Sequence, residues 1–144
     1  MSERLLNMLG LMRRANAVDI GETNTGGTCR AGKAKLLVLA ADASDNARSR
    51  AEGFVRGHNV VTVCLPFTKE EISDHVGLRG CSMAAITDIG FANAFIKALS
   101  LEYPGKYDEA AAEVEQRFSK AERRKKEAAA HERNKRIGKR RTNV

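Results

Sequence analysis

The chain has 144 residues, with 25 Lys and Arg against 18 Asp and Glu and a formal net charge of +7. This length allows one domain with a proper core and one appendage, and the positive balance favours an anionic partner. The three cysteines lie far apart in the sequence, which argues against a disulfide framework. The sequence shows no signal-peptide pattern and no apolar run long enough to span a membrane. We therefore expect a cytoplasmic protein without a membrane partner, and we expect it to be a monomer.

The first part of the chain predicts a helix, a strand, a second helix and a strong strand. Apolar residues recur at helical spacing over 3–15, and 17–20 can form a short strand. Residues 22–31 are expected to form a glycine-weakened helix that stops at Gly32. The continuous apolar run 36–41 is typical of a central strand that is covered on both faces.

The same alternation continues to residue 104. We predict a helix after the capping segment 42–45, with Ala47, Ala51, Phe54 and Val55 inside, and a strand over 60–65. Thr68 and Glu71 have capping-box spacing and begin a short helix to about residue 75. A loop over 77–82 and a strand over 83–87 follow, and Asp88 then caps a helix whose inner residues are Phe91, Phe95 and Leu99. This order predicts a three-layer α/β/α domain over residues 1–104.

Residues 105–144 form the second unit that the sequence predicts. They hold 13 basic and 7 acidic side chains, whereas residues 1–104 hold 12 and 11, so this tail carries most of the net charge. Its Ala, Glu, Lys and Arg content predicts a long helix. Four residues near its start can dock on the body, namely Ala110, Val114, Phe118 and Ala121, and the rest should project into solvent.

The Gly-rich stretch 20–35 suits a phosphate or an RNA backbone, because helix starts present backbone N–H groups to anions. Gly27 to Lys33 nearly matches a P-loop, but Ala34 replaces the magnesium-binding Ser or Thr, and the strong strand follows the lysine. His58, His75 and His131 lie far apart without metal-ligand or catalytic spacing. We therefore expect no enzyme, no metal and no cofactor.

Thr23 and Asn24 have short polar side chains that can reach base edges, while Arg30, Lys33 and Lys35 can hold phosphates. Four of these residues also have a purely structural alternative. Thr23 and Asn24 can cap the second helix, and the two lysines can belong to a solvated turn.

Several segments resemble a known family: 9–15, 21–25, 30–36, 40–44 and 84–92. These segments occur in the same order over residues 3–100 as in the kink-turn RNA-binding ribosomal proteins of the large subunit, the L-seven-Ae and L-thirty-e type, to which the chain is similar. The similarity is strongest to the stand-alone bacterial members of that family. The resemblance implies an α/β/α sandwich with a four-stranded mixed sheet. It also implies that three neighbouring loops recognise a sharply bent RNA.

The resemblance assigns roles to individual positions. The family's junction glycine falls on Gly21, and its two base-reading positions after Glu22 fall on Thr23 and Asn24. Its acidic residue after the central strand falls on Asp42, for which helix capping is the favoured role. Its apolar loop falls on 77–82, with Gly77 at the start and Leu78 and Arg79 at the tip, although Leu78 can also be ordinary core edge. Two positions depart from the family: Gly27 replaces a basic residue, and Thr23-Asn24 replaces an Asn-Glu or Lys-Gln pair.

We therefore expect a non-enzymatic protein that binds structured, kink-turn-like RNA, with ribosomal RNA as a candidate, in association with the ribosome or translation. Two alternatives belong to other classes. The first is a protein-interaction module that uses the charged tail helix. The second is a nucleotide-binding α/β domain, which this layered architecture often hosts but does not imply.

Overall fold

The computed structural model describes residues 2–142 of the chain, with a four-stranded mixed sheet in the strand order β1-β4-β2-β3. The α/β fold and each predicted strand are confirmed. The elements follow the chain as α1 (Ser2–Arg14), β1 (Val18–Ile20), α2 (Glu22–Arg30), β2 (Leu36–Leu39), α3 (Asp45–Val55), β3 (Val61–Cys64), α4 (Lys69–Val76), β4 (Met83–Ile86), α5 (Ile89–Glu102) and α6 (Asp108–Thr142).

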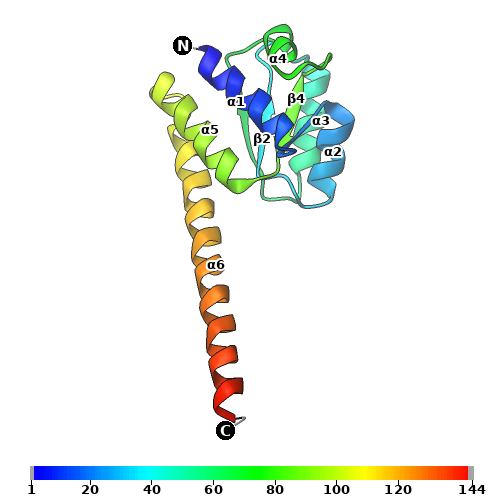
Figure 1. The fold of residues 1–144 in the computed structure, drawn as a ribbon. Coiled ribbons are helices and arrows are strands. Elements are labelled where there is room, and N and C mark those ends of the chain that lie inside the picture. The colour runs from blue at the N-terminus through cyan, green and yellow to red at the C-terminus, as the bar shows by residue number, and fades with distance from the viewer. Residues whose placement is uncertain (1, 143–144) are drawn as a thin grey trace.

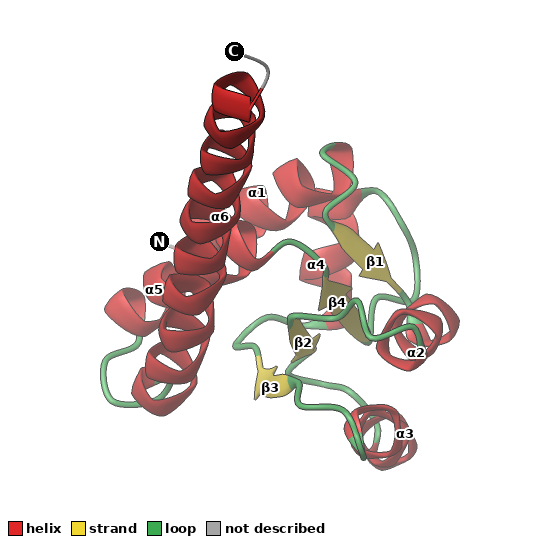
Figure 2. Cartoon of the chain, turned by 90° about the horizontal axis from the view of Figure 1, so that it is seen from below, coloured by secondary structure: helices red, strands yellow, loops and turns green. Residues whose placement is uncertain are grey.

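Helices cover both faces of the sheet, which makes three layers (Figures 1 and 2). α1, α4, α5 and the start of α6 lie on one face, and their buried residues form the main core. α2 and α3 lie on the other face over a smaller core. The helices therefore bury apolar residues on both sides of the sheet, as the predicted layered architecture requires.

β2 is the central strand that the apolar run predicts, since it lies between β4 and β3 and is buried throughout. Leu36 and Val38 face the main core, whereas Leu37 and Leu39 face the smaller one. Because successive side chains of a strand point to opposite faces, a strand covered on both sides must be apolar at every position.

Side-chain caps define the starts of α3, α4 and α5. Ser44 Oγ accepts the Ala47 N–H at 3.1 Å, Thr68 and Glu71 form the predicted capping box, and Asp88 Oδ1 accepts the Phe91 N–H at 2.9 Å. One prediction is wrong: Phe91 is 36% exposed, while Phe95 is fully buried. Ala92, Phe95, Ile96 and Leu99 define the buried side of α5, and Phe91 lies at the border of that side.

The long helix α6 starts inside the body and then projects away from it (Figure 1). Val114 is fully buried in the main core, and Ala110 packs against the same core. Tyr107, just before the helix, is also buried there, and its hydroxyl donates to the Cys64 carbonyl at 2.6 Å. From residue 123 to residue 137 nearly every side chain is exposed, so the predicted projecting helix is present.

None of the helices within residues 2–142 combines the length and apolar character that a bilayer-crossing helix needs.

Candidate nucleic-acid interface

Three chain segments meet at one edge of the sheet. β1 and β2 both run antiparallel to β4, so the ends of β1 and β2 lie beside the start of β4. The Gly21 N–H donates to the Met83 carbonyl at 3.0 Å, and the Ala40 N–H donates to the Ser82 carbonyl at 2.8 Å. We call this border the Gly21 edge; it comprises residues 21–24, 40–42 and 77–82.

Gly21 forms the junction between β1 and α2 in a conformation that glycine favours. Its φ of +96° lies in the region that other residues rarely adopt, although a Cβ there would meet no atom within 4 Å. The constraint at this position is therefore the backbone angle and not space. The turn directs the first residues of α2 outward at the end of the sheet.

Thr23 and Asn24 are both exposed in the first turn of α2. Asn24 Nδ2 donates to the Ile20 carbonyl at 2.9 Å, which fixes the plane of the carboxamide and so the direction of its acceptor oxygen. Gly21 is the N-cap residue, and no side chain caps this helix. The alternative in which Thr23 and Asn24 cap α2 is therefore wrong, and both remain available at the surface.

The neighbouring candidates Glu22 and Asp42 are held by other elements. Glu22 Oε1 lies 2.6 Å from Arg50 Nη1, an ion pair that joins α2 to α3. Asp42 Oδ1 accepts the Lys69 N–H at 2.8 Å. Asp42 therefore accepts a hydrogen bond from the first turn of α4. The adjacent helix α3 is capped by Ser44 instead.

The loop over residues 77–82 is shaped by contacts at both ends. Gly77 ends α4 with a left-handed φ of +76°, and the Cys81 thiol donates to the Leu78 carbonyl at 3.2 Å. The Arg13 guanidinium donates to the Val76 carbonyl beneath this loop. Leu78 is 39% exposed, so it lies at the surface, as does Arg79.

Arg13 is a positioning residue that the sequence did not reveal. A basic residue in the last turn of a helix ordinarily does no more than compensate the helix dipole. The Val76 carbonyl that it binds lies 63 positions away, and no local spacing signals such a pair. A Cβ on Gly77 would also lie 3.1 Å from Arg13 Nη1, so this corner is tightly packed.

The basic candidates Arg30, Lys33 and Lys35 lie at the opposite edge. α2 has nine residues, and at about 1.5 Å per residue it carries the chain roughly 13 Å across the sheet. Lys35 then donates its N–H to the Ile86 carbonyl, at the far end of β4. The structure therefore separates these three residues from Thr23, Asn24 and Leu78. We call this second border, residues 30–35 and 57–60, the Lys35 edge.

The segment resembling a P-loop does not cradle a phosphate. Gly27 lies inside α2, and the N–H groups of Ala31, Gly32 and Lys33 donate to the carbonyls of Gly27, Cys29 and Thr28. Backbone donors already used in a helix end cannot surround an anion. Within the described residues, moreover, no three His, Cys, Asp or Glu side chains form a group that could hold a metal ion.

No protein-family model matches the sequence, and no curated protein matches it at the sequence level. Many solved structures share its fold, including two proteins from different organisms. A protein with unknown function from Bacillus halodurans has a TM-score of 0.60 at 18% identity, over 67% of this chain and 96% of its own. A 15.5kD RNA binding protein from Giardia lamblia has a TM-score of 0.54 at 19% identity, over 69% of this chain and 84% of its own.

Proposed function

We propose that this chain is a non-enzymatic RNA-binding protein that recognises structured, kink-turn-like RNA through the Gly21 edge. The observation that carries the proposal is the meeting of Thr23, Asn24 and the exposed Leu78 at one border of the sheet. A protein of the same fold from Giardia lamblia is an RNA binding protein. The resemblance in residues 3–100 supports the same function and a role with the ribosome or in translation.

The chemistry of this edge suits irregular RNA. Proteins read RNA sequence mainly at loops and bulges, where unstacked bases expose their hydrogen-bonding edges and faces. The fixed carboxamide of Asn24 and the Thr23 hydroxyl supply the hydrogen bonds, and Leu78 supplies an apolar contact for a displaced base. Arg79 beside it supplies charge for a phosphate.

In this proposal residues 1–104 select the RNA, and the basic residues beyond 105 add affinity that does not depend on sequence. Phosphate contacts position a protein, whereas base contacts specify the site. The Gly21 edge carries Glu22 and Asp42 as well as Arg79, so it is not strongly basic. Selectivity there must come from hydrogen bonds and shape.

The test is the double substitution Thr23→Ala with Asn24→Ala, measured on a kink-turn RNA and on a plain duplex of equal length. Loss of one good base contact costs about 1–3 kcal/mol, by analogy with the reading of DNA bases. Affinity for the kink-turn should fall at least fivefold, and affinity for the duplex should change little.

Thr62→Ala with Asn134→Ala is the matched control, because both residues are exposed, have the same chemistry and lie outside the Gly21 edge. This control should bind both RNAs as the unchanged chain does. Equal losses on kink-turn and duplex by the Thr23 and Asn24 variant, with an intact circular dichroism spectrum, would contradict base recognition at this edge.

A further inference from the structure

A groove opens at the Lys35 edge, where α6 leaves the body. Its volume is about 570 Å³, and its walls come from the loop before β2, the loop before β3, the start of α5 and the middle of α6. In Figure 1 this place is the inner corner between the lower border of the body and the projecting helix. The lining residues are Gly32, Ala34, Lys35, Gly57, His58, Asn59, Val60, Ile89, Arg117, Lys120, Ala121 and Arg124.

The charge of this groove has one sign. Lys35, Arg117, Lys120 and Arg124 contribute cations, while no Asp or Glu is among the lining residues. A concave surface with one sign of charge concentrates the field and attracts ions of the opposite sign. The groove is therefore built for an anion.

Arg117 fixes the geometry of the groove more than it supplies charge. Its Nη2 donates to Asn59 Oδ1 at 2.9 Å, and its Nη1 donates to the Asn59 carbonyl. Glu113 Oε1, one turn earlier on α6, accepts from the same guanidinium at 2.9 Å and balances its charge. This clamp holds α6 against the loop before β3, so the two walls of the groove keep their spacing.

The basic residues of the groove continue along α6 as a stripe. Arg117, Lys120, Arg124, His131 and Lys135 follow one another at intervals of three, four or seven residues, which places them on one side of an α-helix. Ala121, Glu127 and Ala128 also lie on that side, and the Glu127 carboxylate is 4.0 Å from Arg123 Nε. The stripe therefore leads from the groove outward along the projecting helix. A small ligand needs an enclosed pocket, whereas a track of cations fits an extended polyanion.

We propose that this groove and the stripe, at the opposite edge from Thr23 and Asn24, bind a second length of RNA backbone through Lys35, Lys120 and Arg124. This inference rests on the proposed function, since it assigns the phosphate contacts of the same bound RNA. α2 spans the body between the two edges in roughly 13 Å, so one folded RNA can reach both. Selection and phosphate binding are then separated on two borders of one sheet.

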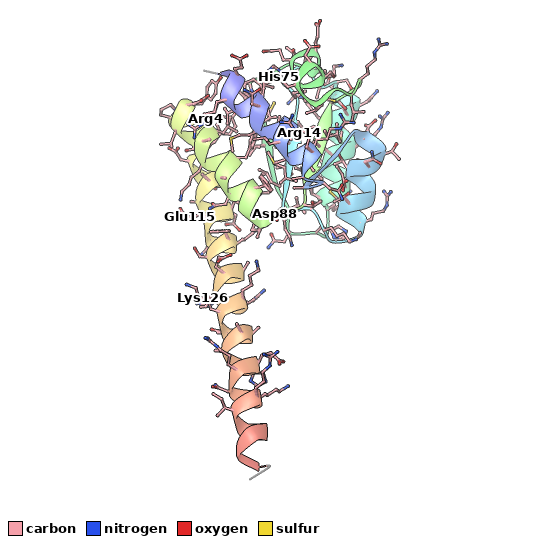
Figure 3. The ribbon with its side chains drawn as sticks, in the orientation of Figure 1. Arg4, Arg14, His75, Asp88, Glu115 and Lys126 are labelled. Atoms are coloured by element: carbon pink, nitrogen blue, oxygen red, sulfur yellow. The ribbon has the colours of Figure 1, made fainter. Side chains whose placement is uncertain are left out.

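The experiment compares two double variants of the full chain that remove equal charge. Lys120→Gln with Arg124→Gln removes two cations of the stripe. Lys126→Gln with Arg133→Gln removes two exposed cations from the opposite side of α6, on which Lys126 is marked in Figure 3. Both variants insert a good helix former, so neither should weaken α6.

Affinity for the kink-turn RNA is measured at several salt concentrations. Each phosphate contact contributes about 0.7–0.9 to the slope of log affinity against log salt. The Lys120 and Arg124 variant should flatten the slope by about 1.4–1.8, and Lys35→Gln should flatten it by roughly a further 0.7–0.9. The Lys126 and Arg133 variant should keep the slope of the unchanged chain.

Equal slopes for the two double variants overturn the proposal, whether both flatten or neither does. If both flatten, the charges of α6 act without a defined face, and if neither does, RNA does not reach this corner. In either outcome the unchanged chain still binds RNA, and the Thr23 and Asn24 variant still tests the Gly21 edge separately. Absence of RNA binding by the unchanged chain would instead refute the proposed function itself.

Discussion

The carboxylate of Asp42, which follows β2, accepts a hydrogen bond of 2.8 Å from the backbone N–H of Lys69, the first residue of α4. The first N–H groups of a helix have no partner within it, so this bond satisfies one of them from another segment. α4 leads directly into the loop over residues 77–82. The Asp42 bond therefore helps to hold this loop, with Leu78 at its tip, at the Gly21 edge.

We predict that Asp42→Ala lowers the free energy of unfolding by about 1 kcal/mol, the usual effect of removing a side-chain acceptor at a helix start. Asp42→Asn should lose much less, because its amide oxygen can accept the same bond. Chemical denaturation of the two variants measures this difference. Equal loss in both would show that the negative charge matters more than the hydrogen bond.

The position of Gly27 in α2 predicts a gain of affinity. A Cβ at Gly27 would meet no atom within 4 Å, so a longer side chain can be added without a clash. Gly27→Lys places a cation at the position where the family that this chain resembles has a basic residue. The variant should bind the kink-turn RNA more tightly, with a salt dependence steeper by about 0.7–0.9. It should also be more stable by about 0.5–1 kcal/mol, since glycine is unfavourable inside a helix.

Gly53→Lys is the control for this gain. Gly53 lies inside α3, is exposed, and is equally free of neighbours around its missing Cβ. The two variants therefore share the same charge and the same gain in helix propensity, but they place the cation on different helices. If Gly53→Lys increases affinity as much as Gly27→Lys does, the gain reflects net charge and not a contact made by α2.

The order of elements was predictable from the sequence, but the grouping of the candidate residues was not. The continuous apolar run of β2 and the Thr68–Glu71 capping box are local patterns, and both predictions are confirmed. Arg30 and Lys33 follow Asn24 closely in the chain, yet α2 carries them to the other edge. Contacts such as Arg13 with Val76 join residues far apart, and no spacing rule foresees them.

Tyr107 provides a prediction about pH. Burial raises its pKa to about 12 from an ordinary value of 10.0, with smaller contributions from Cys64 and Tyr103. The folded protein thus keeps the phenol neutral and donating to the Cys64 carbonyl at 2.6 Å. The contribution of this neutral phenol to the stability of the fold is fully present below pH 10. It is lost as the pH rises from 10 towards 12, because the unfolded chain ionises first.

The unchanged chain should therefore lose about 2 kcal/mol more stability than Tyr107→Phe over that interval, since one pKa unit corresponds to about 1.4 kcal/mol. Chemical denaturation at several pH values measures the difference. Tyr103→Phe leaves Tyr107 as the one tyrosine of the chain, so its ultraviolet absorbance then follows this residue alone. A phenol that ionises at its ordinary pKa of 10.0 in that variant would refute the assignment.

The last prediction concerns the basic end of α6. Tyr107 and Val114 belong to the main core, so a cut before them would remove buried side chains. A cut after Glu122 spares both, and the described part of the segment that it removes, residues 123–137, is almost all exposed. Residues 123–144 contain ten of the 25 Lys and Arg and two of the 18 Asp and Glu. The shortened chain therefore keeps 15 basic and 16 acidic residues and has a net charge of −1.

The chain ending at Glu122 should therefore unfold at nearly the same denaturant concentration as the full chain. It should lose affinity for every RNA and show a much flatter salt dependence, because the positive charge that displaces counterions has gone. The preference for kink-turn over duplex should survive, since Thr23, Asn24 and Leu78 remain in place. Salt titrations on both RNAs measure slope and preference together. A truncated chain that keeps the full slope would show that residues 123–144 make no phosphate contacts, and one that loses the preference would place part of the selectivity on α6.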